Sequence, residues 1–295
     1  MSRFRNHTPS ENLDRGDAVP TAGGWGVTSA PPVWAIVAVG LLSLTALVAG
    51  CGIPAGGAAG GTAGVLARLR PLVAACHGPL NGYVGWDLSG SARRTPSLTP
   101  SRLQTLQNVA DQVAACTGYL RVVGFSATIT DTTVLGEAEF PNSSATEAAR
   151  ILQANRTVTA LIASAVKALP SAMDAVSPNG TDVLSQLTLA AQFQAQRTSG
   201  TLDLVLLTDG IATTGPVMMN TTSFTDRVAR SAATLVPVPN LSGAAVRFIG
   251  IGRVAGPGSA QPPSWYTAAL TDFYSAACAR TRAHCLVTTD YTPGG

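Results

Sequence analysis

The sequence predicts an α/β protein with a doubly wound, mainly parallel sheet that is covered by helices on both faces. Short apolar stretches alternate with longer stretches of helical periodicity from residue 83 onward, and this order requires crossover connections between parallel strands. Residues 202–207 read LDLVLL, which is typical of a strand buried on both faces. A segment of about 200 residues is also long enough to bury one core.

Each element follows from its local pattern. Strands are expected at residues 83–88, 120–127, 134–140, 202–207, 246–251 and 285–288, and the more polar one at 134–140 fits a sheet edge. Helices are expected at residues 101–116, 145–173, 182–195, 225–235 and 265–280, and the stretch 145–173 is long enough for one helix or two. The first of these carries apolar residues at helical spacing, and Ser101 is placed to cap it.

Composition argues against nucleic-acid binding. The formal net charge is +3 and only 12% of the residues are charged. Nucleic-acid-binding domains usually carry a clustered basic face. Lys167 is the one lysine among the 19 basic residues.

An uncharged apolar segment precedes the predicted domain. Residues 33–50 read VWAIVAVGLLSLTALVAG, and eighteen residues reach the lower limit for crossing a bilayer. Val48-Ala49-Gly50-Cys51 resembles a bacterial lipobox, in which the cysteine becomes lipidated after cleavage. An uncleaved signal anchor is the alternative, because residues 1–32 are long and contain three acidic residues. A buried core helix is a third possibility, but the segment has no polar face.

Both membrane interpretations place the remaining chain outside the cytoplasm. The expected organisation is a polar segment at 1–32, an apolar signal or anchor segment at 33–51, a Gly/Ala-rich tether at 52–65 and the α/β domain at 66–295. The tether contains no bulky side chains that would build a core. The expected location is the extracytoplasmic face of a cell membrane, with a lipid anchor or a single membrane span.

Four cysteines lie in the predicted domain. In an exported protein an even number favours disulfides, and the pairs Cys76–Cys116 and Cys278–Cys285 each flank one helix or one tight turn. Three pairings remain open from sequence alone, and buried free thiols are the alternative in a cytosolic protein. The three histidines are isolated from one another and from the cysteines, so a zinc site is not expected.

Three polar segments follow predicted strands or precede a predicted helix. They are Asp87-Leu88-Ser89-Gly90-Ser91, Gly180-Thr181-Asp182 and Thr208-Asp209-Gly210. In α/β sheets of this kind, ligands bind outside the carboxyl ends of the strands. Hydroxyl and carboxylate oxygens suit a hard cation such as Mg²⁺. Each segment alone is an ordinary turn or helix cap, so the prediction of a metal site rests on their convergence.

The Asp-x-Ser-x-Ser motif, the later threonine and the strand-end aspartate resemble, in this order, the metal-ion-dependent adhesion site of von Willebrand factor type A domains. The resemblance covers about residues 80–290. It implies a mainly parallel six-stranded sheet whose second and third strands form an antiparallel hairpin. It also implies a Mg²⁺ or Mn²⁺ ion with Ser89, Ser91 and Thr181 as direct ligands. Asp87 would act through water, and Asp209 would bind directly or through water.

These observations predict a membrane-anchored extracytoplasmic binding protein. A protein partner would offer an Asp or Glu carboxylate to the metal. A metal-dependent hydrolase is an alternative, but no histidine or paired carboxylate that would serve as a general base accompanies the motif in sequence. An assembly factor for an envelope complex is a further alternative. We therefore expect no catalytic residues and no enzymatic activity.

Overall fold

The computed structural model describes residues 61–93, 96–219, 223–254 and 261–291. These residues belong to one compact unit that spans residues 54–295. The expected polar segment at 1–32, the apolar segment at 33–51 and most of the tether lie outside the described residues. Along the chain the elements are α1 (Thr62–Ala74), β1 (Leu80–Asp87), α2 (Gly90–Arg93), the 3-10 turn η1 (Pro96–Leu98), α3 (Thr99–Ala115), β2 (Tyr119–Phe125), β3 (Thr132–Glu139), α4 (Glu147–Ala175), α5 (Val183–Ala195), β4 (Thr201–Leu207), α6 (Asp226–Leu235), β5 (Ala245–Ile249), α7 (Ser264–Arg280) and β6 (His284–Thr288).

The sheet has the predicted α/β architecture. Its six strands lie in the order β3-β2-β1-β4-β5-β6. All neighbouring pairs are parallel except β2 and β3, which form an antiparallel pair. The polar strand β3 lies at an edge, as its sequence predicts. The apolar strand β4 lies in the interior of the sheet, where both of its faces are covered.

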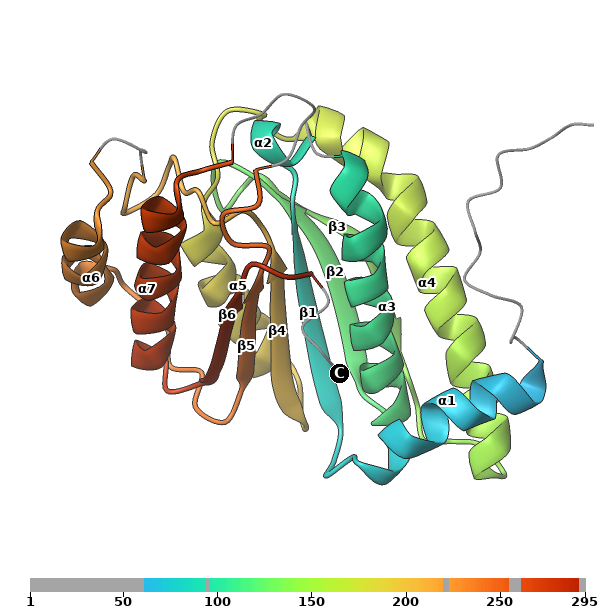
Figure 1. The fold of residues 1–295 in the computed structure, drawn as a ribbon. Coiled ribbons are helices and arrows are strands. Elements are labelled where there is room, and N and C mark those ends of the chain that lie inside the picture. Colours follow the sequence, from blue (N-terminus) through green and yellow to red (C-terminus); the bar gives the residue numbers. More distant parts are fainter. Residues whose placement is uncertain (1–60, 94–95, 220–222, 255–260, 292–295) are drawn as a thin grey trace, which may run out of the picture. The chain divides into compact units, whose positions relative to one another are not determined.

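Helices cover both faces of the sheet (Figure 1). On one face, α3 and α4 pack on a cluster that includes Val84, Trp86 and Val205. On the other face, α5, α6 and α7 pack on a cluster that includes Tyr83 and Leu204. Neighbouring strand residues therefore contribute to opposite clusters, because side chains alternate across a strand.

Two helix starts differ from the sequence prediction in ways that change its interpretation. Helix α3 begins at Thr99, so Ser101 lies inside the helix and is not its cap. The helix begins earlier because Pro100 occupies its first turn, where the missing N–H costs nothing. Helix α1 begins at Thr62, within the segment expected to be a tether. The first residues of this helix are small and do not show a helical pattern of apolar side chains. The buried residue of α1, Leu69, lies in its second half.

Helix α4 is the one described helix that is long and apolar enough to cross a bilayer by length and composition. It is a single helix of 29 residues, although the sequence allows two. A buried stripe along it includes Ala154, Val158, Leu161 and Ala165. This stripe packs with residues of the sheet in one hydrophobic cluster. The apolar character of α4 thus has a role inside the fold.

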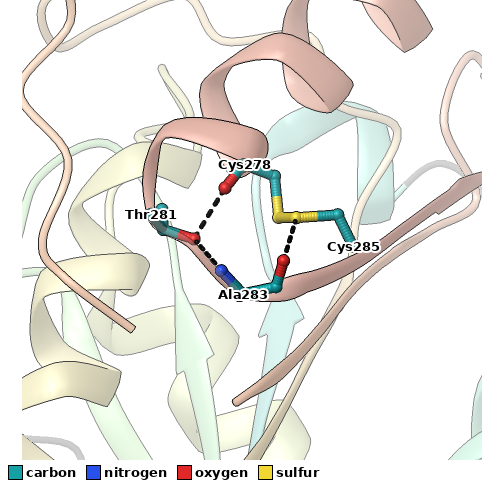
Figure 2. Close-up of a disulfide and its surroundings, with 4 residues drawn as sticks. All are labelled: Cys278, Thr281, Ala283 and Cys285. Carbon is teal, nitrogen blue, oxygen red and sulfur yellow. Dashed lines mark hydrogen bonds between the residues drawn. A yellow bond between two sulfur atoms is a disulfide. The ribbon is translucent and has the colours of Figure 1, made fainter. Parts of the chain in front are cut away.

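The two expected disulfides are confirmed. Cys76 pairs with Cys116 and joins the end of α1 to the end of α3. Cys278 pairs with Cys285 and joins α7 to β6 (Figure 2). Inside the second loop, the Thr281 hydroxyl donates a hydrogen bond to the Cys278 carbonyl at 2.6 Å and accepts one from the Ala283 N–H at 3.3 Å. Two disulfides are typical of proteins that fold outside the cytoplasm.

Removing the disulfide between α7 and β6 should destabilise the protein moderately. The bond spans 7 residues of sequence, and closing so short a loop stabilises by about 2.5 kcal/mol through chain entropy. A Cys278→Ala/Cys285→Ala variant should lose about this much free energy of unfolding in denaturant titrations. The matched Cys76→Ala/Cys116→Ala variant opens a separation of 40 residues and should lose more, about 4 kcal/mol. The reverse order of losses would contradict the loop-length argument.

Candidate functional site

The first loop of the candidate site follows β1. The Asp87 carboxylate accepts a hydrogen bond from the Ser89 N–H at 2.8 Å, which closes a tight turn directly after the strand. Helix α2 begins at Gly90, so Ser89 and Ser91 lie at the start of a short helix. Their hydroxyl oxygens are 3.1 Å apart. The loop thus places two hydroxyls close together next to a fully buried carboxylate.

The second loop joins α4 to α5. Its backbone contacts the first loop, because the Gly90 N–H donates to the Pro178 carbonyl at 2.8 Å. It also contacts the end of β2, because the Asp182 N–H donates to the Ser126 carbonyl at 2.9 Å. Asp182 caps α5 through the Ser185 N–H at 3.2 Å. Thr181, directly before this cap, is buried with 3% of its surface exposed.

The third loop follows β4 and contacts both of the others. The Thr208 hydroxyl donates to the second oxygen of Asp87 at 2.7 Å. The Thr213 N–H donates to the Thr181 carbonyl at 3.3 Å. Asp209 accepts a hydrogen bond from the Ile211 N–H at 2.9 Å. Hydrogen bonds therefore link each loop to the other two.

The structure thus brings the predicted site residues to one end of the sheet. Ser91 is hydrogen-bonded to the Asp209 carboxylate, and Asp87 lies close enough to act on the charge of Asp209. This end, where the parallel strands finish, is called the carboxyl end of the sheet below. In Figure 1 it is the upper end, which carries α2.

The pKa values of the Asp87 and Asp209 carboxyls are both raised. Burial raises the pKa of Asp87, whereas hydrogen bonds from Ser89 and Thr208 oppose the shift. Burial and the charge of Asp87 raise the pKa of Asp209 to about 6, although its hydrogen bond to Ser91 lowers it. When both acids are ionised, the single positive charge of Arg102 leaves a local excess of negative charge. A cation is the natural partner for such a set.

Two residues near the site have no role in the sequence analysis. Arg102 of α3 is buried, and its charge lowers the pKa of both Asp87 and Asp209. Its Nε donates to the Tyr291 hydroxyl at 3.3 Å, and its guanidinium lies 5.6 Å from the Tyr291 ring centroid. The sequence carries a signal for Arg102, because a charged residue stands there four residues before Leu106, at a position of the helical pattern that is otherwise apolar. Tyr291 gave no signal, since its segment follows the last predicted strand.

The donor set fits a hard cation rather than a soft one. Within the described ranges, no three His, Cys, Asp or Glu side chains gather in a group that would hold a metal. The candidate site instead combines two carboxylates with the hydroxyls of Ser89 and Ser91, and Thr181 lies in the adjoining loop. Oxygen donors of this kind suit Mg²⁺ or Mn²⁺.

The sequence matches no protein-family profile and no curated protein. Among solved structures, proximal thread matrix protein 1 from the mussel byssus is 14% identical with a TM-score of 0.38, over 74% of this chain and 45% of that one. The pilus adhesin SpaC from Lactobacillus rhamnosus GG is 13% identical with a TM-score of 0.36, over 72% and 28%. The vWF domain of the pilus tip protein Mfa5 from Porphyromonas gingivalis is 16% identical with a TM-score of 0.27, over 57% and 59%. The chain thus spans less than half the length of the first two. The function proposed below rests on the residues of this chain.

Proposed function

We propose that this chain is a membrane-anchored extracytoplasmic binding protein that docks a protein partner through a divalent metal. The observation that carries the proposal is the convergence of three loops on one point. Asp87, Thr181 and Asp209 come from separate segments, yet direct hydrogen bonds join the loops that hold them. A single ion with oxygen ligands requires this arrangement.

The proposed ligand set follows the von Willebrand factor type A resemblance. Ser89, Ser91 and Thr181 would hold Mg²⁺ or Mn²⁺ directly, Asp87 would act through water, and Asp209 would bind directly or through water. When bound, the ion supplies a positive charge that neutral hydroxyl ligands leave largely uncompensated. That charge would attract an Asp or Glu carboxylate of a protein partner.

The loops themselves favour this use because they hold the ligands rigidly. The Asp87 carboxylate is fixed through both oxygens, by the Ser89 N–H and the Thr208 hydroxyl. The Tyr274 hydroxyl donates to the Gly210 carbonyl at 2.8 Å and supports the third loop from the core. A preorganised site pays little ordering cost when it binds.

An Asp209→Ala variant tests the metal site. Calorimetric titration of Mg²⁺ or Mn²⁺ into the wild type should show binding at millimolar metal or below, and the variant should lose at least about tenfold in affinity, since one charged ligand is gone. The fold should persist, because the side chain lies in a loop. Asp174→Ala is the matched control, because Asp174 is an exposed carboxylate on the last turn of α4 and should leave metal affinity unchanged.

Two outcomes would contradict the proposed site. One is equal metal affinity in wild type and Asp209→Ala, and the other is no binding to the wild type at millimolar metal. Partner docking is tested separately by pull-down with and without chelator, with Asp87→Ala as the control. A partner that binds equally in chelator does not use the metal.

The alternatives differ in measurable ways. A metal-dependent hydrolase would turn over a model ester or phosphate in a metal-dependent manner. Both histidines of the described chain, His77 and His284, lie at the opposite end of the sheet, beside the starts of β1 and β6. An assembly factor for an envelope complex would co-purify with several partners and would need the metal only for scaffold integrity.

A further inference from the structure

The end of the sheet opposite the candidate site carries a concentration of arginines. Strands β1, β2, β4, β5 and β6 begin there, α4 also begins there, and α3, α5 and α7 end there (Figure 1, lower end). Five arginines without a carboxylate partner lie in or beside these element ends. We call this surface the arginine-rich end, and it consists of Arg150, Arg156, Arg197, Arg280 and Arg282.

Most carboxylates of this end are already neutralised by other arginines. Asp111 pairs with Arg68. Glu137 pairs with Arg121 at 2.9 Å, Glu147 with Arg70 at 3.6 Å and Asp203 with Arg247. Glu139 is the one carboxylate here without an ion pair among the described residues. No described carboxylate oxygen lies within 4.0 Å of the five guanidiniums of the arginine-rich end.

The described partners of these arginines are neutral. Arg150 donates to the Ala115 carbonyl at 3.1 Å, at the end of α3. Arg280 donates to two carbonyls at the end of α6, at 2.7 and 2.6 Å. Arg197 lies 4.2 Å from the ring centroid of Tyr119. Such contacts hold the side chains in place without a carboxylate within ion-pair distance. The charge of Arg197 also acts on Glu137 and helps to lower the pKa of that carboxyl, so Arg197 is partly compensated.

A hollow of about 570 Å³ opens at the same end, between the end of β3 and the first turns of α4. Its lining combines Arg150 and Arg156 with the hydroxyls of Ser143, Ser144 and Thr157, together with Glu139. Guanidiniums and hydroxyls are the groups that contact phosphate oxygens. The volume lies in the range of pockets that hold small ligands, so a phosphate-bearing headgroup fits.

The chain enters the domain beside this surface. Helix α1 is held against α4 by the Arg68–Asn155 hydrogen bond of 2.7 Å and against α3 by the Cys76–Cys116 bond. Thr62, the first residue of α1, follows Cys51 by eleven residues in sequence, a stretch that reaches at most about 40 Å. An anchor at residues 33–51 would therefore hold the domain within about 40 Å of the membrane, a reach that allows the arginine-rich end to contact it. The candidate metal site lies about 26 Å from this end, the length of the eight-residue strand β1.

We propose that the arginine-rich end rests on an anionic phospholipid surface and takes a lipid phosphate in the hollow beside α4. The inference deepens the membrane anchoring proposed above and does not depend on the metal. Its consequence is an orientation in which the acidic carboxyl end of the sheet, with Asp87 and Asp209, faces away from the membrane. The metal site would then meet partners that approach from outside.

Vesicle partition in chelator tests this contact apart from both the anchor and the metal. The compact unit of residues 54–295 contains both disulfides and the whole described core, so it is the protein to use. It should sediment with vesicles that contain phosphatidylglycerol and stay in solution with pure phosphatidylcholine vesicles. An Arg156→Gln/Arg282→Asn variant should lose about 30-fold in partition, because each basic residue near an anionic surface contributes about fivefold and the two contributions multiply. Asn suits position 282, whose φ is 64°.

The matched control is Lys167→Gln/Arg227→Gln. These two exposed residues remove the same charge, but they lie away from the arginine-rich end, in the second half of α4 and the first turn of α6. The control should keep at least half of the wild-type partition. Mass spectrometry of the native amino-terminal peptide determines separately whether Cys51 is lipidated.

Three results would overturn the proposal. Equal binding to neutral and anionic vesicles would remove the electrostatic basis, and an equal loss in the control variant would show that net charge alone is responsible. Tighter binding to soluble polyglutamate than to anionic vesicles would assign the surface to an acidic polypeptide. None of these results bears on metal binding, so the two proposals fail independently.

Discussion

A Gly118→Ala variant should lose about 3 kcal/mol or more of its free energy of unfolding, or fail to fold. Gly118 lies between α3 and β2, where the chain passes the start of β1. A Cβ built at this position would lie 1.8 Å from the Leu80 carbonyl oxygen and 2.5 Å from the carbonyl carbon. Both atoms belong to the backbone, so no side-chain rotation relieves the clash. The backbone at the start of β1, or the chain that leads into β2, would have to move.

Denaturant unfolding of Gly118→Ala measures this effect. Gly61→Ala is the matched control, because a Cβ there meets nothing within 4 Å. Gly61 is the N-cap of α1, and the control should therefore lose less than about 1 kcal/mol. Similar losses in the two variants would show that the close approach to Leu80 is not the reason for a glycine at position 118.

Arg247→Met should cost about 3–5 kcal/mol at neutral pH, because it leaves a buried carboxylate without its partner. The Asp203 side chain is only 5% exposed, and the Arg247 side chain is 24% exposed. Arg247 Nε donates to one carboxylate oxygen at 3.2 Å, and an Nη donates to the other. Burial raises the pKa of Asp203, and the Arg247 charge opposes this shift. Without the guanidinium, the pKa should rise further.

The loss should depend on pH in a defined direction. A folded-state pKa above the unfolded value of 3.8 means that the folded protein holds the proton more tightly. Stability is then highest below the unfolded pKa and falls as pH rises through the folded pKa. Arg247→Met should therefore be less destabilised in mildly acidic buffer than at neutral pH. Adding Asp203→Asn should recover most of the loss, and a pH-independent defect that persists in the double variant would point to lost packing instead.

Local sequence determined most of the elements of this fold. The run LDLVLL could only be buried on both faces, and it lies inside the sheet as β4. Asp182 caps α5 because a short acidic side chain next to an apolar helical stretch accepts the first free N–H groups. Of the two disulfides, Cys278–Cys285 joins α7 to β6, which are consecutive in sequence, whereas Cys76–Cys116 joins α1 to α3 across β1. Periodicity and capping act within a few residues, so they can be read without the fold.

The three polar loops of the candidate site were also visible in sequence, because parallel strands place their carboxyl ends together. Their contacts were not visible. The Thr208 hydroxyl reaches Asp87 across 121 residues of sequence, and Arg102 meets Tyr291 across 189. Neither pair has a local signal, since each partner satisfies an ordinary local pattern by itself.

The sequence by itself determined the fold class, the order of the elements and the candidate ligands, because hydrophobic period and turn chemistry are local properties. Only the tertiary structure decided where charge accumulates. Arg156 and Arg282 are separated by most of the domain in sequence, and they come to one end because helices return the chain to the start of each parallel strand. The burial that crowds Asp87 and Asp209 likewise arises only when three loops pack together, since desolvation is a property of the assembled fold.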